Sequence, residues 1–340
     1  KKMSRKHGTY GSFFFILSRT LGASLRMFIV IYVLYEFVFS AWNIPFEATV
    51  FLFLALILLF TFKGGIKTIV WTDTLQTTCM LAALVICFIM IGDKMNFSFS
   101  EMLTNVTKSD YFTFIETDSS SRLCWWKQIL GGMFITISMT GLDQEKMKKN
   151  LSCKNIKSAQ KNMLTFSLTL FFVNFLFLCL GAALYIFAHN QGITVKGDDL
   201  FPYVALNALS PFAAVIFIIG LISALFPSAD GALTSLTTSF SIDFLNIEQR
   251  KDWNEKKKIR IRHLVHICFA LIFVGVIIFY GNHRDPHLID ILYQIASITY
   301  GPLLGLFVFG ILTKRQVKDK FVPIVCVLSP VICFILSNNS

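Results

Sequence analysis

The chain has 340 residues, of which 55% are hydrophobic and only 15% are charged, and 36 of them are Phe. This composition excludes a soluble globular protein and is typical of a polytopic helical membrane protein. The formal net charge of +11 would suit a nucleic-acid partner, but the positions of the basic residues give it another meaning.

Nine apolar stretches, each near the length that a bilayer requires, follow one another along the chain. We expect membrane-spanning helices at residues 12–39, 46–62, 67–92, 126–142, 163–188, 206–241, 262–281, 287–312 and 320–337. The sequence therefore predicts an all-α membrane protein in which residues 1–340 form a single transmembrane domain.

Lys and Arg alternate in abundance from one connection to the next. Connections on the side where the chain begins hold 23 of the 31 basic residues, those on the other side hold six, and the first span holds two. Since cytoplasmic loops are enriched in Lys and Arg, we expect residue 1 on the cytoplasmic side. We separately expect the membrane to be the plasma (inner) membrane of a bacterium. The basic balance then reflects topology, and no nucleic-acid partner is expected.

Asp73 lies well inside the third span, on a polar face with Thr72 and Gln76. One interpretation is a buried functional acid. The other is a carboxylate near the start of a helix, paired with the helix dipole or with Lys67.

The segment 93–125 is expected to be irregular, and the fourth span that follows it carries Gly131-Gly132, Thr136, Ser138 and Thr140. Small residues and hydroxyls suit close helix packing, and they equally suit a broken helix that lines a cavity.

The sixth span has a polar stripe at helical spacing, in residues 221–243. Its members are Ser223, Pro227, Asp230, Thr234, Thr237 and Ser241. Pro227 has no N–H, so the carbonyl of Ser223 loses its partner. That oxygen, the Ser228 hydroxyl and the Asp230 carboxylate could form a hard-cation site. The alternative is a buried kink with locally bonded hydroxyls.

The later spans add few polar groups. We expect His266 to be a satisfied histidine at a helix end, whereas the eighth span carries Gln294 and a Gly301-Pro302 break. No catalytic triad, zinc motif or phosphate-binding glycine loop occurs, so no enzyme and no resident cofactor are expected. Polar, interrupted spans in mid-membrane are typical of a transporter or channel.

Four segments resemble successive landmarks of the sodium/solute symporter family, which includes sodium–glucose, proline and sialic acid transporters. They are GGIKTIVWTDTLQ (64–76), TGLDQEKMKKNLSCKN (140–155), SALFPSADGALTSLTTSFSIDFL (223–245) and YGPLLGLFVFGILTKR (300–315). The resemblance implies a LeuT-like five-plus-five inverted repeat, with core helices 3–10 and one trailing helix present. It also implies an N-terminally truncated member that lacks the first core helices.

The resemblance further implies sodium ligands. The family's sodium site uses a carbonyl that matches Ala224 and hydroxyls that match Pro227 and Ser228, so Pro227 is a departure that the Ser223 carbonyl would offset. A second sodium position matches Asp73, near a hydroxyl that is replaced here by Asp230. Two carboxylates in one small region would share a cation, or one would be protonated, which keeps proton coupling open.

The residues that match the family's substrate pocket are Thr136, Met139, Thr140 and Gln294. The stacking aromatic of the sugar transporters is replaced by Met139, which disfavours a hexose. We therefore expect a sodium-coupled symporter that imports a small polar solute (a sugar, amino acid, carboxylate or sialic acid) by alternating access. A proton-coupled carrier and a transporter-like membrane sensor domain are the alternatives.

Overall fold

The computed structural model describes residues 5–63, 66–109, 115–121, 123–141, 150, 153–250, 252–283, 301–302, 304–306, 308–309, 312–313 and 321–338. Across these ranges the regular structure is helical and includes no strand, in agreement with the all-α expectation.

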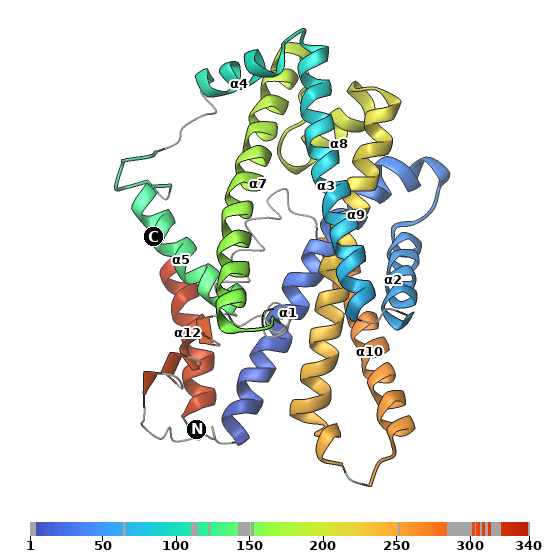
Figure 1. Ribbon diagram of the computed structural model, residues 1–340, viewed down its shortest axis with the longest axis vertical. Coiled ribbons are helices and arrows are strands. Elements are labelled where there is room, and N and C mark those ends of the chain that lie inside the picture. The colour runs from blue at the N-terminus through green and yellow to red at the C-terminus, as the bar shows by residue number, and fades with distance from the viewer. Residues whose placement is uncertain are drawn as a thin grey trace.

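The α-helices of the described chain follow in the order shown in Figure 1. They are α1 (Arg5–Leu34), α2 (Phe46–Lys63), α3 (Ile66–Lys94), α4 (Phe99–Lys108), α5 (Trp125–Gly141), α7 (Ile156–Gln191), α8 (Leu200–Tyr203), α9 (Pro211–Ser239), α10 (Glu255–Asn282) and α12 (Val322–Asn338). Three π-helical turns extend or precede them: η1 (Tyr35–Phe39), η4 (Val204–Ala208) and η5 (Phe240–Phe244).

Five helical stretches are long and apolar enough to cross a membrane, so the chain is an integral membrane protein. They are Gly11–Trp42, Trp71–Lys94, Ile156–Gln191, Pro211–Phe244 and Glu255–Asn282. Two shorter apolar stretches, Phe46–Phe62 and Val322–Ile332, match the second and ninth expected spans. The eighth expected span, 287–312, lies largely outside the described residues.

The sixth span begins later than expected. Leu209 is extended (φ −91°, ψ −163°), and α9 begins only at Pro211. The Ser210 hydroxyl caps it by accepting the backbone N–H of Ala213 at 3.3 Å. Proline suits the first helical position because it lacks an N–H, and it disfavours helix for the residue before it. The apolar run from 206 is therefore divided between η4 and α9.

The segment 93–125 is not irregular throughout, because α4 lies within it. Ser98 and Glu101 form a capping box: the Ser98 hydroxyl accepts the Glu101 N–H at 3.4 Å, and Glu101 Oε2 accepts the Ser98 N–H at 2.7 Å. The Ser-x-x-Glu spacing that precedes this helix is a sequence signal for it. The expectation of a wholly irregular segment was wrong for this reason.

Two groups of helices build the interior. The largest buried cluster joins α1, α2, α9 and α10 through side chains that include Phe28, Ile57, Leu233 and Phe273. On the other side of α9, Figure 1 shows α3 beside it and running in the opposite direction. Helix α9 thus lies between a well-packed apolar cluster and α3.

Candidate functional site

Helices α3 and α9 approach each other closely at Gly220. A Cβ added there would lie 2.6 Å from the Cβ of Ala83 and 3.7 Å from the Cα of Met80, so the two backbones are nearly in contact. Small residues at such a crossing allow membrane helices to pack this closely. The contact fixes which residues of the two helices lie at the same level.

Asp73 and Ser228 lie level with each other in this antiparallel pair. From Gly220 to Ser228 is about 12 Å along α9 at about 1.5 Å per residue. From Met80 and Ala83 back to Asp73 is about 10–15 Å along α3, in the same direction in space. Asp73 and Ser228 are both half-buried.

Asp73 also lies on the side of α3 that faces α9, and Ser228 lies at the edge of the α3-facing side of α9, about 80° around the helix from Gly220. Positions three or four apart share a helix face. The shared positions are Asp73, Gln76, Met80 and Ala83 on α3, and Gly220, Ala224, Pro227, Ser228 and Gly231 on α9. A carboxylate of α3 and a hydroxyl of α9 therefore lie at one level of the helix pair. Ser228 is also a little more than one turn from the Ser223 carbonyl, which Pro227 leaves without its intrahelical partner.

Asp230 and Ser228 point in different directions. It follows Ser228 by two residues, about 200° around a helix of 3.6 residues per turn, so the two side chains leave α9 on opposite sides. Asp230 is 4% exposed, and its Oδ1 accepts the Thr234 hydroxyl at 3.3 Å. Asp230 therefore leaves α9 on the opposite side from Ser228, and it shares a helix face with Pro227 and Ser223, three and seven residues away.

The expected substrate residues are not gathered at this site by the described structure. Thr136 is exposed on α5, which Figure 1 shows on the far side of α7 from α3 and α9. The side chains of Met139 and Thr140, and all of Gln294, lie outside the described residues.

Gln76 is a polar group of this site whose role the sequence did not single out. Its Oε1 atom is buried and has no hydrogen-bond partner among the residues that the structure describes. It lies three residues after Asp73 on the α9-facing side of α3. Its helical spacing from Asp73 was a signal for a ligand role, but burial of one particular oxygen depends on the packing of α9.

His266 is buried, not exposed at a helix end, and only one of its nitrogens has a partner. Its Nδ1 lies 2.9 Å from the Thr237 hydroxyl, while Nε2 has no partner within the described part of the chain. The expectation of a histidine at a helix end was wrong, because His266 lies in the interior of α10, and the expectation that it is satisfied holds for Nδ1 alone.

Long antiparallel helices that share polar groups inside the membrane are typical of helical secondary transporters. Comparison of the sequence with known protein families identifies the kind of transporter. The family model "Sodium:solute symporter family" matches residues 17–319, and the chain belongs to that family. Its members are transporters and not enzymes.

Curated relatives include the sodium/sialic acid symporter SiaT of Proteus mirabilis (strain HI4320), which is 22% identical over 76% of this chain and 54% of its own length. The human sodium/iodide cotransporter is 24% identical over 74% of this chain and 40% of its own. Human sodium-coupled monocarboxylate transporter 1 is 26% identical over 73% of this chain and 42% of its own length. The chain thus spans about half the length of the curated relatives it matches.

A solved structure shares the fold. The substrate-bound, outward-open state of a Na+-coupled sialic acid symporter matches 97% of this chain and 74% of its own, with a TM-score of 0.75 and 19% identity. This likeness agrees with the LeuT-like fold that the motifs implied.

Proposed function

We propose that the protein is a sodium-coupled symporter that imports a small polar organic solute by alternating access. We also propose that residues 1–340 form one transmembrane domain in a bacterial plasma membrane, with residue 1 on the cytoplasmic side. The observation that carries the proposal is the placement of Asp73 and Ser228 at one level on facing sides of α3 and α9.

The proposed sodium site uses oxygen ligands from two helices. Asp73 supplies the single negative charge, and Ser228 supplies a hydroxyl. The backbone supplies the carbonyls of Ser223 and Ala224, and Gln76 Oε1 is a further oxygen within the same interface. Oxygen ligands suit a hard cation, and one carboxylate inside a membrane is less costly when a cation neutralises it.

In this proposal, sodium and substrate are coupled through linkage. If substrate binding favours the conformation in which α3 and α9 hold the cation, then sodium must strengthen substrate binding by the same factor. One sodium ion moving down 100 mV releases about 2.3 kcal/mol, which sustains a substrate gradient of roughly fifty-fold.

The names of the relatives support an anionic substrate. Sialic acid, iodide and monocarboxylates are the solutes in those names, and each is an anion at neutral pH. Within our proposal, a carboxylate or sialic acid is therefore favoured over a neutral sugar. The absence of a stacking aromatic at Met139 agrees with this choice.

The decisive experiment measures uptake by the full-length protein in proteoliposomes. We expect a sodium gradient to drive accumulation of a carboxylate or sialic acid, and Asp73→Asn or Ser228→Ala to raise the sodium concentration for half-maximal uptake at least tenfold. Asp93→Asn, an exposed acid on the same helix, is the matched control and should have no effect.

Equal accumulation driven by a pH gradient without sodium would overturn the assignment and support a proton-coupled carrier. The observation that keeps this second function in view is Asp230, a buried acid on the opposite side of α9 from Ser228. In that case Asp230→Asn, and not Asp73→Asn, should abolish uptake.

A further inference from the structure

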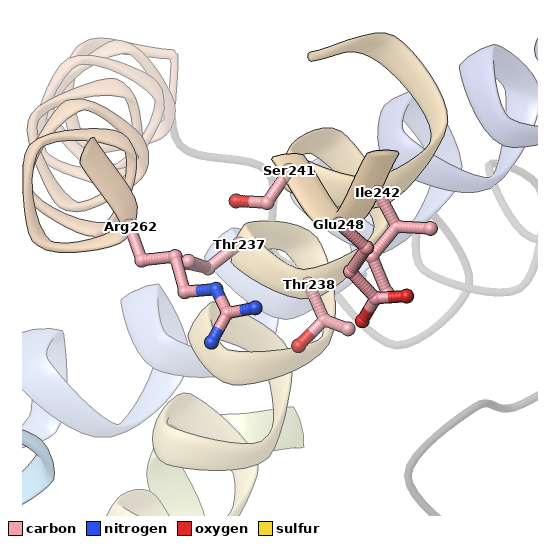
Figure 2. Close-up of a pocket in the computed structure, with 6 residues that line it drawn as sticks. All are labelled: Thr237, Thr238, Ser241, Ile242, Glu248 and Arg262. Atoms are coloured by element: carbon pink, nitrogen blue, oxygen red, sulfur yellow. The ribbon is translucent and has the colours of Figure 1, made fainter. Parts of the chain in front are cut away.

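A second polar site lies at the far end of α9. A cavity of about 350 Å³ is bounded by the end of α9, by η5, by the 3₁₀ turn η6 (Ile247–Gln249) and by α10 (Figure 2). Its lining residues are Thr237, Thr238, Ser241, Ile242, Glu248 and Arg262. Ser241 is 13 residues beyond Ser228, about 20 Å along the helix, so the cavity is separate from the proposed sodium site.

Ser241 is a buried hydrogen-bond donor in the wall of the cavity. It is 1% exposed, and its Oγ has no hydrogen-bond partner within the described part of the chain. Figure 2 shows this hydroxyl directed toward the side where the Arg262 side chain lies. Buried hydroxyls without a partner are rare, and a bound group or water usually explains one.

Thr237 offers a second donor, one turn earlier on the same helix face. Its hydroxyl lies 2.9 Å from Nδ1 of His266, whose Nε2 is buried without a partner among the described residues. A buried N–H without a partner is the rarer defect, so we assign the hydrogen to Nδ1. Thr237 then accepts that hydrogen, and its own hydroxyl hydrogen is free to point into the cavity.

Arg262 provides the charge. It extends from α10 across the cavity toward Thr237 and Thr238 (Figure 2), and no carboxylate of the described residues lies within salt-bridge distance of its guanidinium. A guanidinium presents several N–H donors in a planar fork that matches phosphate oxygens. Two hydroxyl donors and a guanidinium around one cavity select an anion with several oxygens.

Glu248 is the acidic group of the lining and lies opposite Arg262. Like Arg262 it is exposed, so water screens its repulsion of an anion as well as the attraction of the guanidinium, and the directed N–H and O–H donors decide the fit. Its position also suits the ammonium of a zwitterionic ligand whose phosphate faces Arg262. The volume is about ten times the ~30 Å³ of one water, enough for a phosphate and its ester substituent.

We propose that this cavity binds a phosphate group, either free or as part of a lipid head group. The phosphate oxygens accept from Arg262, Ser241 and Thr237. The surroundings suit the membrane surface: residues 255–262 (EKKKIRIR) hold five Lys and Arg, and the half-exposed Ile242 adds an apolar wall. Juxtamembrane basic segments of this kind attract anionic lipid surfaces.

The test uses the full-length protein in detergent, with inorganic phosphate as the first probe and thermal stability as the readout. We expect phosphate to stabilise the wild type, with at least tenfold weaker apparent affinity in Ser241→Ala and Arg262→Gln. The matched control is Arg260→Gln, which removes an equal charge from an exposed position of α10 outside the cavity. It should behave as the wild type.

Two further measurements distinguish loss of the phosphate site from misfolding and from damage to the sodium site. Without phosphate, Ser241→Ala should be at least as stable as the wild type, because it removes an unpaired buried hydroxyl. Sodium affinity should be unchanged in all three variants, so failure here is distinguishable from failure of the sodium site.

The lipid arm reconstitutes the protein in vesicles of phosphatidylethanolamine and phosphatidylglycerol, then extracts it for native mass spectrometry. The proposal is supported if the wild type and Arg260→Gln retain phospholipid but Ser241→Ala and Arg262→Gln do not. This pattern would identify a lipid head group as the source of the phosphate, even if inorganic phosphate does not bind. Absence of both phosphate binding and retained lipid would overturn it. So would equal losses in Arg260→Gln and Arg262→Gln.

Discussion

Pro227 changes the chemistry of α9 by what it lacks. A serine at this position would offer a hydroxyl and an N–H, whereas proline offers neither and leaves the Ser223 carbonyl without a helical partner. The helix nevertheless continues from Pro211 to Ser239. The free carbonyl is therefore held within an ordered helix, on the side of α9 that faces α3.

Replacing Pro227 by Ala tests whether that carbonyl is a sodium ligand. Alanine restores the N–H that pairs with Ser223 but supplies no hydroxyl, so we expect sodium affinity to fall by three- to tenfold. Thermal stability should rise, because proline inside a helix costs up to about 3 kcal/mol. The measurement is the sodium dependence of uptake beside a melting curve.

Pro227→Ser is the companion variant, because it pairs the carbonyl but adds a hydroxyl at the position that matches a family ligand. We expect its sodium affinity to stay within threefold of the wild type. Equal affinities for Pro227→Ala and the wild type would remove Ser223 from the site.

Gly220 is the residue on which the alignment of Asp73 with Ser228 depends. Gly220→Ala places a Cβ 2.6 Å from that of Ala83, so we expect a loss of about 1–3 kcal/mol from overpacking and weaker sodium binding. The double variant Gly220→Ala/Ala83→Gly should regain both. Gly275→Ala on α10, where an added Cβ meets nothing within 4 Å, is the control. No difference between the two alanine variants in melting and sodium titration would contradict this packing.

At the scale of elements, α4 depends on a local capping box outside the candidate spans. Hydrogen bonds from Ser98 lower the pKa of the Glu101 carboxyl from its ordinary 4.5. The backbone N–H of Ser98 has the larger effect and its hydroxyl the smaller one. A lowered pKa stabilises the helix at pH values above 4.5, and the contribution is lost as the pH falls through the folded-state pKa.

We therefore expect both Ser98→Ala and Glu101→Gln to speed hydrogen exchange of the α4 amides at neutral pH. For Ser98→Ala, the loss of a helix cap worth about 1 kcal/mol should speed exchange by a few-fold to about tenfold. Acidification below pH 4 should shrink the difference between the wild type and Glu101→Gln. Unchanged exchange in both variants at neutral pH would show that α4 is held by its contacts with α7 instead.

The elements were largely predictable because their signals are local. The length of the apolar stretches predicted α1, α3, α7, α9 and α10. The capping box at Ser98 could have predicted α4, and Pro211 could have predicted the later start of the sixth span. The alignment of α3 with α9 was not predictable, because it follows from one contact between residues far apart in sequence. The opposite directions of Ser228 and Asp230, in contrast, follow from helical periodicity alone.

For the whole molecule, the cation is expected to act as a stabiliser. A ligand that binds only the folded state adds about 2.7 kcal/mol at 100 times its Kd, so sodium should raise the melting temperature of the full-length protein. Potassium at equal ionic strength is the control, and Asp73→Asn should abolish the difference between the two salts. A transported solute should lower the sodium concentration that gives half of the shift, and sodium should strengthen solute binding by the same factor.

Because the backbones of α3 and α9 are nearly in contact at Gly220, this crossing is a natural pivot for a tilt of α3 relative to α9. No flexible side chain fills the space between Gly220 and Ala83, so α3 can tilt about the crossing more readily than it can separate from α9. Asp73 lies about 12 Å from the crossing, and a tilt of about 10° would carry it about 2 Å past Ser228. That travel is close to the length of a cation–oxygen bond, about 2.3–2.6 Å for a hard cation such as Ca²⁺. If Asp73 and Ser228 hold sodium as we propose, a tilt of this size would be enough to release the ion.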